Sequence, residues 1–124
     1  MKIYYHHTDS GGVVYYAKYL ELLEEARTEF FEERGFSIKE LAKQGILFVV
    51  ARQEIDYKAP AFYGDILHSD TRVNEVGRVK IEFAYEIKNQ NSQIICRAKT
   101  LMVCVDNAFK PQSIPREIRK KLAR

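Results

Sequence analysis

The sequence has no tryptophan, and only two of its 124 residues are cysteine and three are proline. No apolar run approaches the roughly 20 residues that a membrane-spanning helix needs. These scarcities exclude a disulfide-rich scaffold, a proline-rich linker and stable insertion into a membrane. With 46% hydrophobic and 30% charged residues, what remains is the composition of an ordinary globular chain.

The N-terminus and the two cysteines both bear on the compartment of the protein. Residues 1–7 run from Met-Lys-Ile-Tyr-Tyr into two histidines, a pattern that lacks the apolar core and cleavage site of a signal peptide. Cys96 and Cys104 fall in one predicted strand, where roughly 26 Å would separate them, so no disulfide can join them. We interpret them as small buried side chains on one face. We therefore expect a cytoplasmic protein.

The net charge of +3 is small, and basic residues cluster only in the C-terminal tail. A nucleic-acid partner would require a basic face, and the glutamate-rich surface of the longest predicted helix argues against one. We predict no nucleic-acid partner and interpret the tail as a solvated helix face. Binding of the phosphates of a ligand by the tail stays open as an alternative. The tail residues concerned are Arg116, Arg119, Lys120, Lys121 and Arg124.

No repeat, low-complexity run or linker divides the chain, so residues 1–124 are predicted to form one domain. Hydrophobic periodicity and turn residues predict a segregated α+β order, with antiparallel neighbours because the connections are short. The predicted elements are a strand over 2–6, a long helix over 15–34, a short helix over 37–45, strands over 46–58, 65–75, 78–88 and 93–105, and a helical segment over 116–124.

The long helix carries one apolar stripe that a sheet should cover. Its predicted members are Tyr16, Tyr19, Leu20, Leu23, Ala26, Arg27 and Phe30. Because a buried guanidinium needs a partner, we predict an ion pair between Arg27 and Glu24. Ser37 and Glu40 form a capping-box pattern at the start of the short helix. Ile118 and Leu122 are the only apolar pair of the last segment, which we expect on the surface.

Asp9 precedes two glycines and the start of the long helix. Glycines let a backbone approach a ligand closely, and the free N–H groups of a helix start favour negative charge. A carboxylate there could attack a carbonyl or activate water, while the N–H groups hold the resulting oxyanion. The same pattern also fits an ordinary capped loop, and the residues alone leave both interpretations open.

A resemblance to a known family favours the catalytic interpretation. Residues 5–20, Tyr-His-His-Thr-Asp-Ser-Gly-Gly-Val-Val-Tyr-Tyr-Ala-Lys-Tyr-Leu, resemble the N-terminal signature of the 4-hydroxybenzoyl-CoA thioesterase-like family, in particular its Tol-Pal-associated acyl-CoA thioesterase branch. The helix segment 25–29 and the junction 57–65, Tyr-Lys-Ala-Pro-Ala-Phe-Tyr-Gly-Asp, extend the resemblance over nearly the whole chain. It implies a hotdog fold, an antiparallel sheet of about five strands wrapped around one long central helix.

The resemblance implies hydrolysis of an acyl-CoA to the free acid and CoA, with no cofactor and no metal. Asp9 matches the family's catalytic aspartate, the backbone N–H of Tyr16 matches the group that polarises the thioester carbonyl, and Tyr5 matches a tyrosine near the site. The resemblance also implies a homodimer or homotetramer with active sites at subunit interfaces. A non-catalytic module that binds acyl-CoA or an acyl carrier is the alternative function.

Two residues depart from the branch pattern. His7 stands where the branch usually has aspartate, and Tyr16 stands where it usually has histidine. The second departure removes a side chain that assists proton transfer in that branch, so rate and acyl preference are expected to differ. His6 and His7 do not replace it, because adjacent strand residues point to opposite faces. We also predict that they form no metal site with Asp9.

Overall fold

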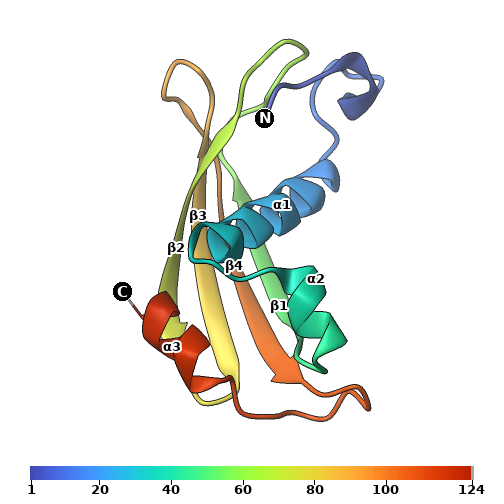
Figure 1. Ribbon diagram of the computed structural model, residues 1–124. Helices are drawn as coiled ribbons and strands as arrows, with labels where there is room; N and C mark the ends of the chain where they lie inside the picture. The colour runs from blue at the N-terminus through green and yellow to red at the C-terminus, as the bar shows by residue number, and fades with distance from the viewer. Residues whose placement is uncertain (124) are drawn as a thin grey trace.

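The computed structural model describes residues 1–123 and, over them, places a four-stranded antiparallel sheet against one long helix, α1 (Lys18–Glu33), as Figure 1 shows. The spatial order of the strands is β1-β4-β3-β2. Their bounds are β1 (Leu47–Tyr57), β2 (His68–Val76), β3 (Lys80–Lys88) and β4 (Ile94–Val105). The predicted α+β order and all four of these strands are confirmed, and no strand end differs from its predicted position by more than three residues. β1 is an edge strand, paired only with β4 in the described chain.

The predicted strand over residues 2–6 is wrong. Lys2 forms a single bridge with Ile66, and the chain then turns through a 3₁₀ helix, η1 (Tyr5–His7). The reason is local: the backbone N–H of Tyr4 donates to Nδ1 of His7 at 2.9 Å, and the Thr8 hydroxyl donates to the Tyr5 carbonyl at 2.6 Å. Side chains that bond to nearby backbone offer the chain an alternative to a strand ladder.

α1 buries one face against the sheet, and aromatic rings fill the contact. Phe30 and Phe31 lie with ring centroids 5.6 and 5.8 Å from that of Phe83 on β3. The predicted stripe is correct in the middle of the helix and wrong at its start, where Tyr16 is 63% and Leu20 47% exposed. The buried residues of α1 are Tyr19, Leu22, Leu23, Ala26, Arg27, Phe30 and Phe31. Tyr16 precedes α1, which begins three residues later than predicted, and Leu20 lies on the exposed side of the helix.

The side chains of β4 that face the core confirm that the two cysteines are small buried residues on one face of a strand. Cys96 and Cys104 are free and fully buried, and every second residue between them is buried as well. Burial raises the pKa of the Cys96 thiol to about 11, which keeps it protonated at neutral pH. These thiols therefore act as packing side chains.

Arg27 makes no ion pair with Glu24, so that prediction is wrong. Its guanidinium lies under the helix and donates to the hydroxyls of Tyr85 (3.3 Å) and Thr100 (3.4 Å). The Tyr85 hydroxyl donates to that of Thr100 at 2.8 Å, and Thr100 donates to Oε1 of Gln53 at 2.7 Å. The buried cation is therefore solvated by a chain of neutral hydroxyl and amide groups that joins α1 to three strands.

The two remaining α-helices contact the two edge strands of the sheet, β1 and β2. α2 (Ile38–Lys43) begins at Ser37, whose hydroxyl accepts the Glu40 N–H at 3.2 Å, as the capping pattern predicts. In α3 (Arg116–Leu122), Ile118 and Leu122 are each 2% exposed and belong to the core, so the expectation of a surface segment is wrong. Arg124, assigned to this segment, lies outside the described residues. None of the helices within residues 1–123 combines the length and the apolarity that crossing a membrane requires.

Candidate active site

Asp9 lies in a tight hairpin that precedes α1. The Tyr15 N–H donates to the His7 carbonyl at 3.1 Å, and the Asp9 N–H donates to the Val13 carbonyl at 2.9 Å. The hairpin docks on the connection between β1 and β2, because the Val14 N–H donates to the carbonyl of fully buried Ala61 at 2.9 Å. The loop that carries the carboxylate is therefore fixed at both its ends and along its side.

The carboxylate of Asp9 is exposed and only partly used by its own loop. Its Oδ1 accepts the Gly11 N–H at 2.8 Å, and no group within residues 1–123 bonds to its Oδ2. Gly12 has φ +81°, a left-handed conformation that favours glycine. A Cβ at Gly11 would lie 3.2 Å from Asp9 Oδ1. Both glycines thus serve the close turn that leaves one carboxylate oxygen available.

The start of α1 offers backbone donors beside this loop. Ala17 is the N-cap residue and supplies no side-chain cap. Within the described chain, the backbone N–H groups of Tyr16 and Ala17 have no acceptor, whereas the next one, of Lys18, donates to the Tyr15 carbonyl at 2.9 Å. Two consecutive free N–H groups at a helix start can stabilise a developing negative charge.

A hollow of about 470 Å³ lies against Asp9 and the first turn of α1. Lys18 and Glu21 form an ion pair across its wall, with Nζ and Oε2 2.7 Å apart. Partial burial and the neighbouring His6 lower the pKa of His7, so the ring is neutral at pH 7 and accepts the Tyr4 N–H. The lining residues are His6, His7, Thr8, Asp9, Tyr15, Ala17, Lys18 and Glu21.

The structure brings Asp9 and the helix start together but does not bring Tyr5 into the same hollow. Tyr5 is 76% exposed, and its ring packs edge-on against Tyr63 at 6.0 Å between centroids. The Tyr16 side chain is also outside the lining of the hollow, where Tyr15 and Ala17 take part instead. The Tyr15 and Tyr16 rings have centroids 4.8 Å apart, and the neighbouring Tyr16 hydroxyl, as an acceptor for the Tyr15 hydroxyl, raises the pKa of the Tyr15 phenol.

Two residues that the sequence did not single out as functional take part in this geometry. Tyr57, the last residue of β1, donates from its hydroxyl to the Tyr16 carbonyl at 2.9 Å. Ala17 contributes a free N–H and lines the hollow. The sequence carries no signal for this role of Tyr57, because a tyrosine at a strand end more often packs than positions a backbone.

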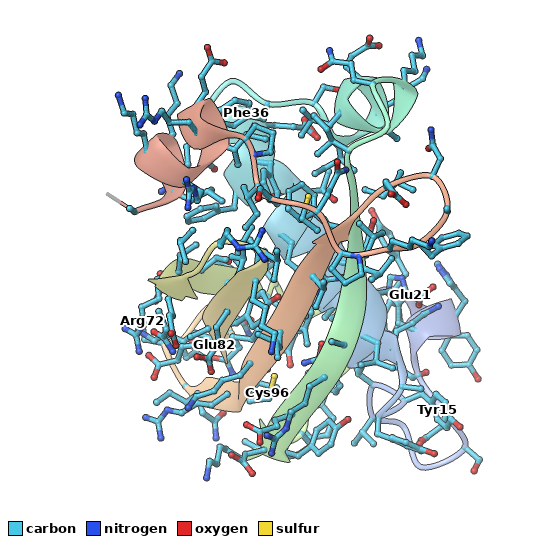
Figure 2. All side chains as sticks on the ribbon, turned by 90° about the horizontal axis from the view of Figure 1, so that it is seen from below. Tyr15, Glu21, Phe36, Arg72, Glu82 and Cys96 are labelled. Carbon is cyan, nitrogen blue, oxygen red and sulfur yellow. The ribbon has the colours of Figure 1, made fainter. Side chains whose placement is uncertain are left out.

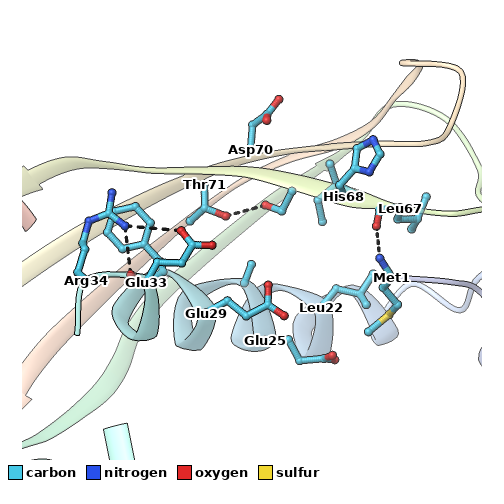
Figure 3. A pocket seen from close by; sticks show the side chains of 14 residues that line it. Met1, Leu22, Glu25, Glu29, Glu33, Arg34, Leu67, His68, Asp70 and Thr71 are labelled. Carbon is cyan, nitrogen blue, oxygen red and sulfur yellow. Dashed lines mark hydrogen bonds and ion pairs between the residues drawn. The ribbon is translucent and has the colours of Figure 1, made fainter. Parts of the chain in front are cut away.

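A second hollow, of about 450 Å³, lies between α1 and β2 (Figure 3). Glu29 and Glu33 project from successive turns of α1 towards it, and Thr71 faces it from β2. The side chains of His68 and Asp70 point away from α1, on the other side of that strand. It shares no lining residue with the hollow at Asp9. Within residues 1–123, no group of three or more histidine, cysteine, aspartate or glutamate side chains is arranged to hold a metal ion.

The basic residues of α3 lie far from Asp9 within one chain. In Figure 1, α3 covers the end of the sheet opposite the N-terminal turn. Lys121 is held there, because its Nζ donates to the Arg34 carbonyl at 3.4 Å and lies over the Phe36 ring. Figure 2 shows Tyr15 and Glu21 on one side of the molecule, with Arg72 and Glu82 on the other. The α3 residues therefore do not line the hollow at Asp9.

Comparisons with known proteins agree over nearly the full length. A family model described as the thioesterase-like superfamily matches residues 5–122. The chain is 35% identical over 119 residues to the acyl-CoA thioester hydrolase YbgC of Escherichia coli, covering 95% of this chain and 89% of that one. It is 36% identical over 121 residues to the acyl-CoA thioesterase YbgC of Haemophilus influenzae, covering 96% and 88%.

The solved structures agree with the predicted fold. A crystal structure of the DHNA-CoA thioesterase of Staphylococcus aureus superposes with a TM-score of 0.94 at 28% identity, covering 99% of this chain and 85% of that one. The hotdog fold is therefore confirmed, with four ladder strands and the Lys2–Ile66 bridge in the place of the fifth. The match includes the hairpin at Asp9, the start of α1 and the β1 edge.

Proposed function

The chain belongs to the thioesterase-like superfamily and is an acyl-CoA thioesterase, and we propose that Asp9 is its catalytic carboxylate. The observation that carries the proposal is the free Oδ2 of Asp9, in a hollow that also meets the uncapped start of α1. The chemistry needs a nucleophile or base beside donors for an oxyanion, and this hollow supplies both.

Asp9 can act by either of two balanced routes. As a nucleophile, its oxygen bonds to the thioester carbon and expels CoA thiolate, and water then cleaves the mixed anhydride to return the carboxylate and the free acid. As a general base, it takes a proton from water while the water oxygen attacks the same carbon. The tetrahedral intermediate then collapses to the free acid and expels CoA thiolate, which takes the proton back from Asp9. In both routes the carbonyl oxygen becomes negative, and we place it at the backbone N–H of Tyr16.

Tyrosine in place of histidine at position 16 is compatible with this reaction. An alkyl thiol such as that of CoA is a much stronger acid than an alcohol and leaves as a thiolate, so this reaction does not require a side chain that protonates the leaving group. The backbone N–H of Tyr16 is the proposed donor to the thioester carbonyl, and every residue except proline has such an N–H. Tyr5, exposed beside Tyr63, is proposed to contact the substrate outside the hollow rather than the reacting atoms.

We further propose that two copies pair along β1. The Leu47–Tyr57 edge carries unpaired backbone groups and exposed apolar side chains such as Val50, features that natural edge strands otherwise avoid. Pairing there would bring the start of one α1 close to a second chain, because Tyr57 at the end of β1 contacts Tyr16. Light scattering should give a dimer or tetramer, and a monomer would contradict the shared site.

Two smaller proposals complete the assignment. Residues 1–124 form one domain, since α1, α2, α3 and strands β3 and β4 contribute to a single hydrophobic cluster. The protein acts in the cytoplasm, which agrees with the two protonated buried thiols, Cys96 and Cys104. A cell fractionation in which the protein appears outside the cytoplasm would contradict the second proposal.

A panel of short-, medium- and long-chain acyl-CoAs and benzoyl-CoA, assayed with a thiol reagent, tests the activity and gives the acyl preference. We expect turnover of at least one ester by the wild type and binding without appreciable turnover by Asp9→Asn. Binding of every ester without turnover by the wild type would favour the non-catalytic alternative. Full activity of a folded Asp9→Asn variant would show that another group performs the chemistry.

A further inference from the structure

We propose that Tyr57 is a positioning residue. Its hydroxyl holds the peptide between Tyr16 and Ala17, just before α1, so that the Ala17 N–H serves as a second oxyanion donor beside that of Tyr16. The inference rests on the proposed site and extends it to β1. Nothing in the resemblance assigns a role to either residue.

The geometry begins with one hydrogen bond. The Tyr57 hydroxyl donates to the Tyr16 carbonyl oxygen at 2.9 Å. That carbonyl and the Ala17 N–H belong to the same peptide plane and point in opposite directions. Fixing the oxygen therefore fixes the direction of the N–H. The Ala17 N–H has no acceptor within residues 1–123, and Ala17 lines the hollow that Asp9 also lines.

The turn closed by the Lys18 N–H on the Tyr15 carbonyl, at 2.9 Å, encloses this peptide, but no side chain of the helix start bonds to it. Most helices begin with a residue whose side chain accepts from the first N–H groups, but Ala17 has no such group and the first turn is uncapped. A capping side chain would also occupy the donors that an oxyanion needs. An anchor on the carbonyl side of the peptide orients the turn and leaves its N–H groups free.

Tyr57 is itself held in place. It pairs with Cys96 of β4, and its ring packs edge-on against buried Tyr19 at 5.5 Å between centroids. Partial burial raises the pKa of the Tyr57 phenol, so the hydroxyl stays protonated and keeps donating across the working range of pH. Because Tyr57 is fixed on the sheet, its hydroxyl can fix the orientation of the Tyr16–Ala17 peptide.

The same bond strengthens the donor. A carbonyl that accepts a hydrogen bond polarises its own peptide and makes the attached N–H a better donor. As the thioester carbon is attacked, negative charge grows on the carbonyl oxygen, and the N–H groups of Tyr16 and Ala17 both donate to that oxygen. The bond from Tyr57 therefore contributes in the transition state more than in the bound ester, and its loss should lower kcat more than it raises KM.

Tyr57→Phe tests this directly, because it keeps the ring against Tyr19 and removes only the hydroxyl. On the fastest ester of the panel we expect kcat to fall about 10-fold, less than for deleting a donor, with KM within about twofold. Tyr63→Phe is the matched control, an exposed tyrosine whose hydroxyl has no partner within the described residues. An unchanged kcat for Tyr57→Phe, or equal losses in both variants, would overturn the proposal.

A spectroscopic readout separates this inference from the role of Asp9. In the Asp9→Asn background, an ester with a ¹³C-labelled carbonyl should show a stretching frequency lowered by the N–H donors. Adding Tyr57→Phe should raise this frequency part of the way back towards that of the free ester. An unchanged frequency would overturn the inference about Tyr57, and the proposed role of Asp9 would still stand. Should Asp9→Asn keep full turnover, the proposed carboxylate fails, and the kcat of the Tyr57→Phe single variant still decides the role of Tyr57.

Discussion

Two aspartate loops at opposite ends of the molecule, residues 9–13 and 106–110, share one hydrogen-bond pattern. In each, the first N–H donates to the fifth carbonyl (2.9 Å in both), and the fourth N–H donates to the first carbonyl (3.0 and 2.9 Å). The third N–H donates to the aspartate Oδ1 at 2.8 Å in both. The fourth residue is left-handed in both, Gly12 with φ +81° and Phe109 with φ +61°.

What differs is the surroundings. Oδ1 of Asp106 also accepts the Lys110 N–H at 3.0 Å, and that aspartate is half-buried at a strand end. Asp9 makes one such bond, is exposed, and meets a hollow and the free donors of α1. An Asp turn is therefore common local chemistry, and its place before an uncapped helix is what makes the first loop a candidate active site.

The largest effect should come from the two carboxylates. Asp9→Asn is expected to lower kcat at least about 100-fold, because the amide can neither attack the thioester nor take a proton from water. Asp106→Asn should leave kcat within about twofold, since its amide oxygen can still accept the loop N–H groups. Steady-state assays on the preferred ester measure both. Similar losses in the two variants would mean that Asp9 supports its loop and nothing more.

An intermediate effect should come from the two left-handed residues. Gly12→Val places a β-branched residue at positive φ and should lower the free energy of unfolding by about 1–2 kcal/mol or more. No atom lies within 4 Å of the added Cβ, so the loss would be backbone strain. Phe109→Gly relieves that strain and should stabilise by roughly 0.5–1 kcal/mol after the entropy of glycine. Urea unfolding of both variants compares the loops, and a neutral Gly12→Val would contradict the account.

The smallest effect concerns pH at the first loop. The folded chain lowers the pKa of His7 below the ordinary histidine value of 6.5, chiefly through burial. The unfolded chain then binds a proton more readily, so this contribution to stability is present above pH 6.5 and is lost as pH falls through the lowered value. An NMR titration of the His7 ring, folded and in urea, should give the lower midpoint when folded. An equal or higher folded midpoint would contradict the burial argument.

The sequence predicted the strands well because period-two alternation and short turns dominate residues 46–105. It failed at residues 2–6, where His7 and Thr8 bind the backbone locally, and at the start of α1, where the turn extends to Ala17. The partner of Arg27 was also mispredicted. Nearness on one helix pointed to Glu24, whereas Tyr85 and Thr100 come from strands distant in the sequence.

For the candidate site, the family resemblance indicated Asp9 and Tyr16, and these remain proposals that the hollow and the free N–H groups support. No local pattern could indicate that Tyr57 contacts the Tyr16 carbonyl, because 41 residues separate them. The sequence also could not predict that Oδ1 of Asp9 accepts a hydrogen bond while Oδ2 stays free, because this depends on how the loop closes. Sequence identified residue types, and only tertiary contacts say which atoms remain available.

The docking of the Asp9 hairpin on residues 61–65 determines when the site can exist during synthesis. The Ile3 N–H donates to the Asp65 carbonyl at 2.7 Å, and Val14 depends in the same way on Ala61. Asp9 leaves the ribosome about fifty residues before these anchors, which must then close a long loop. The proposed site therefore cannot form on the nascent chain until the β1–β2 connection has emerged.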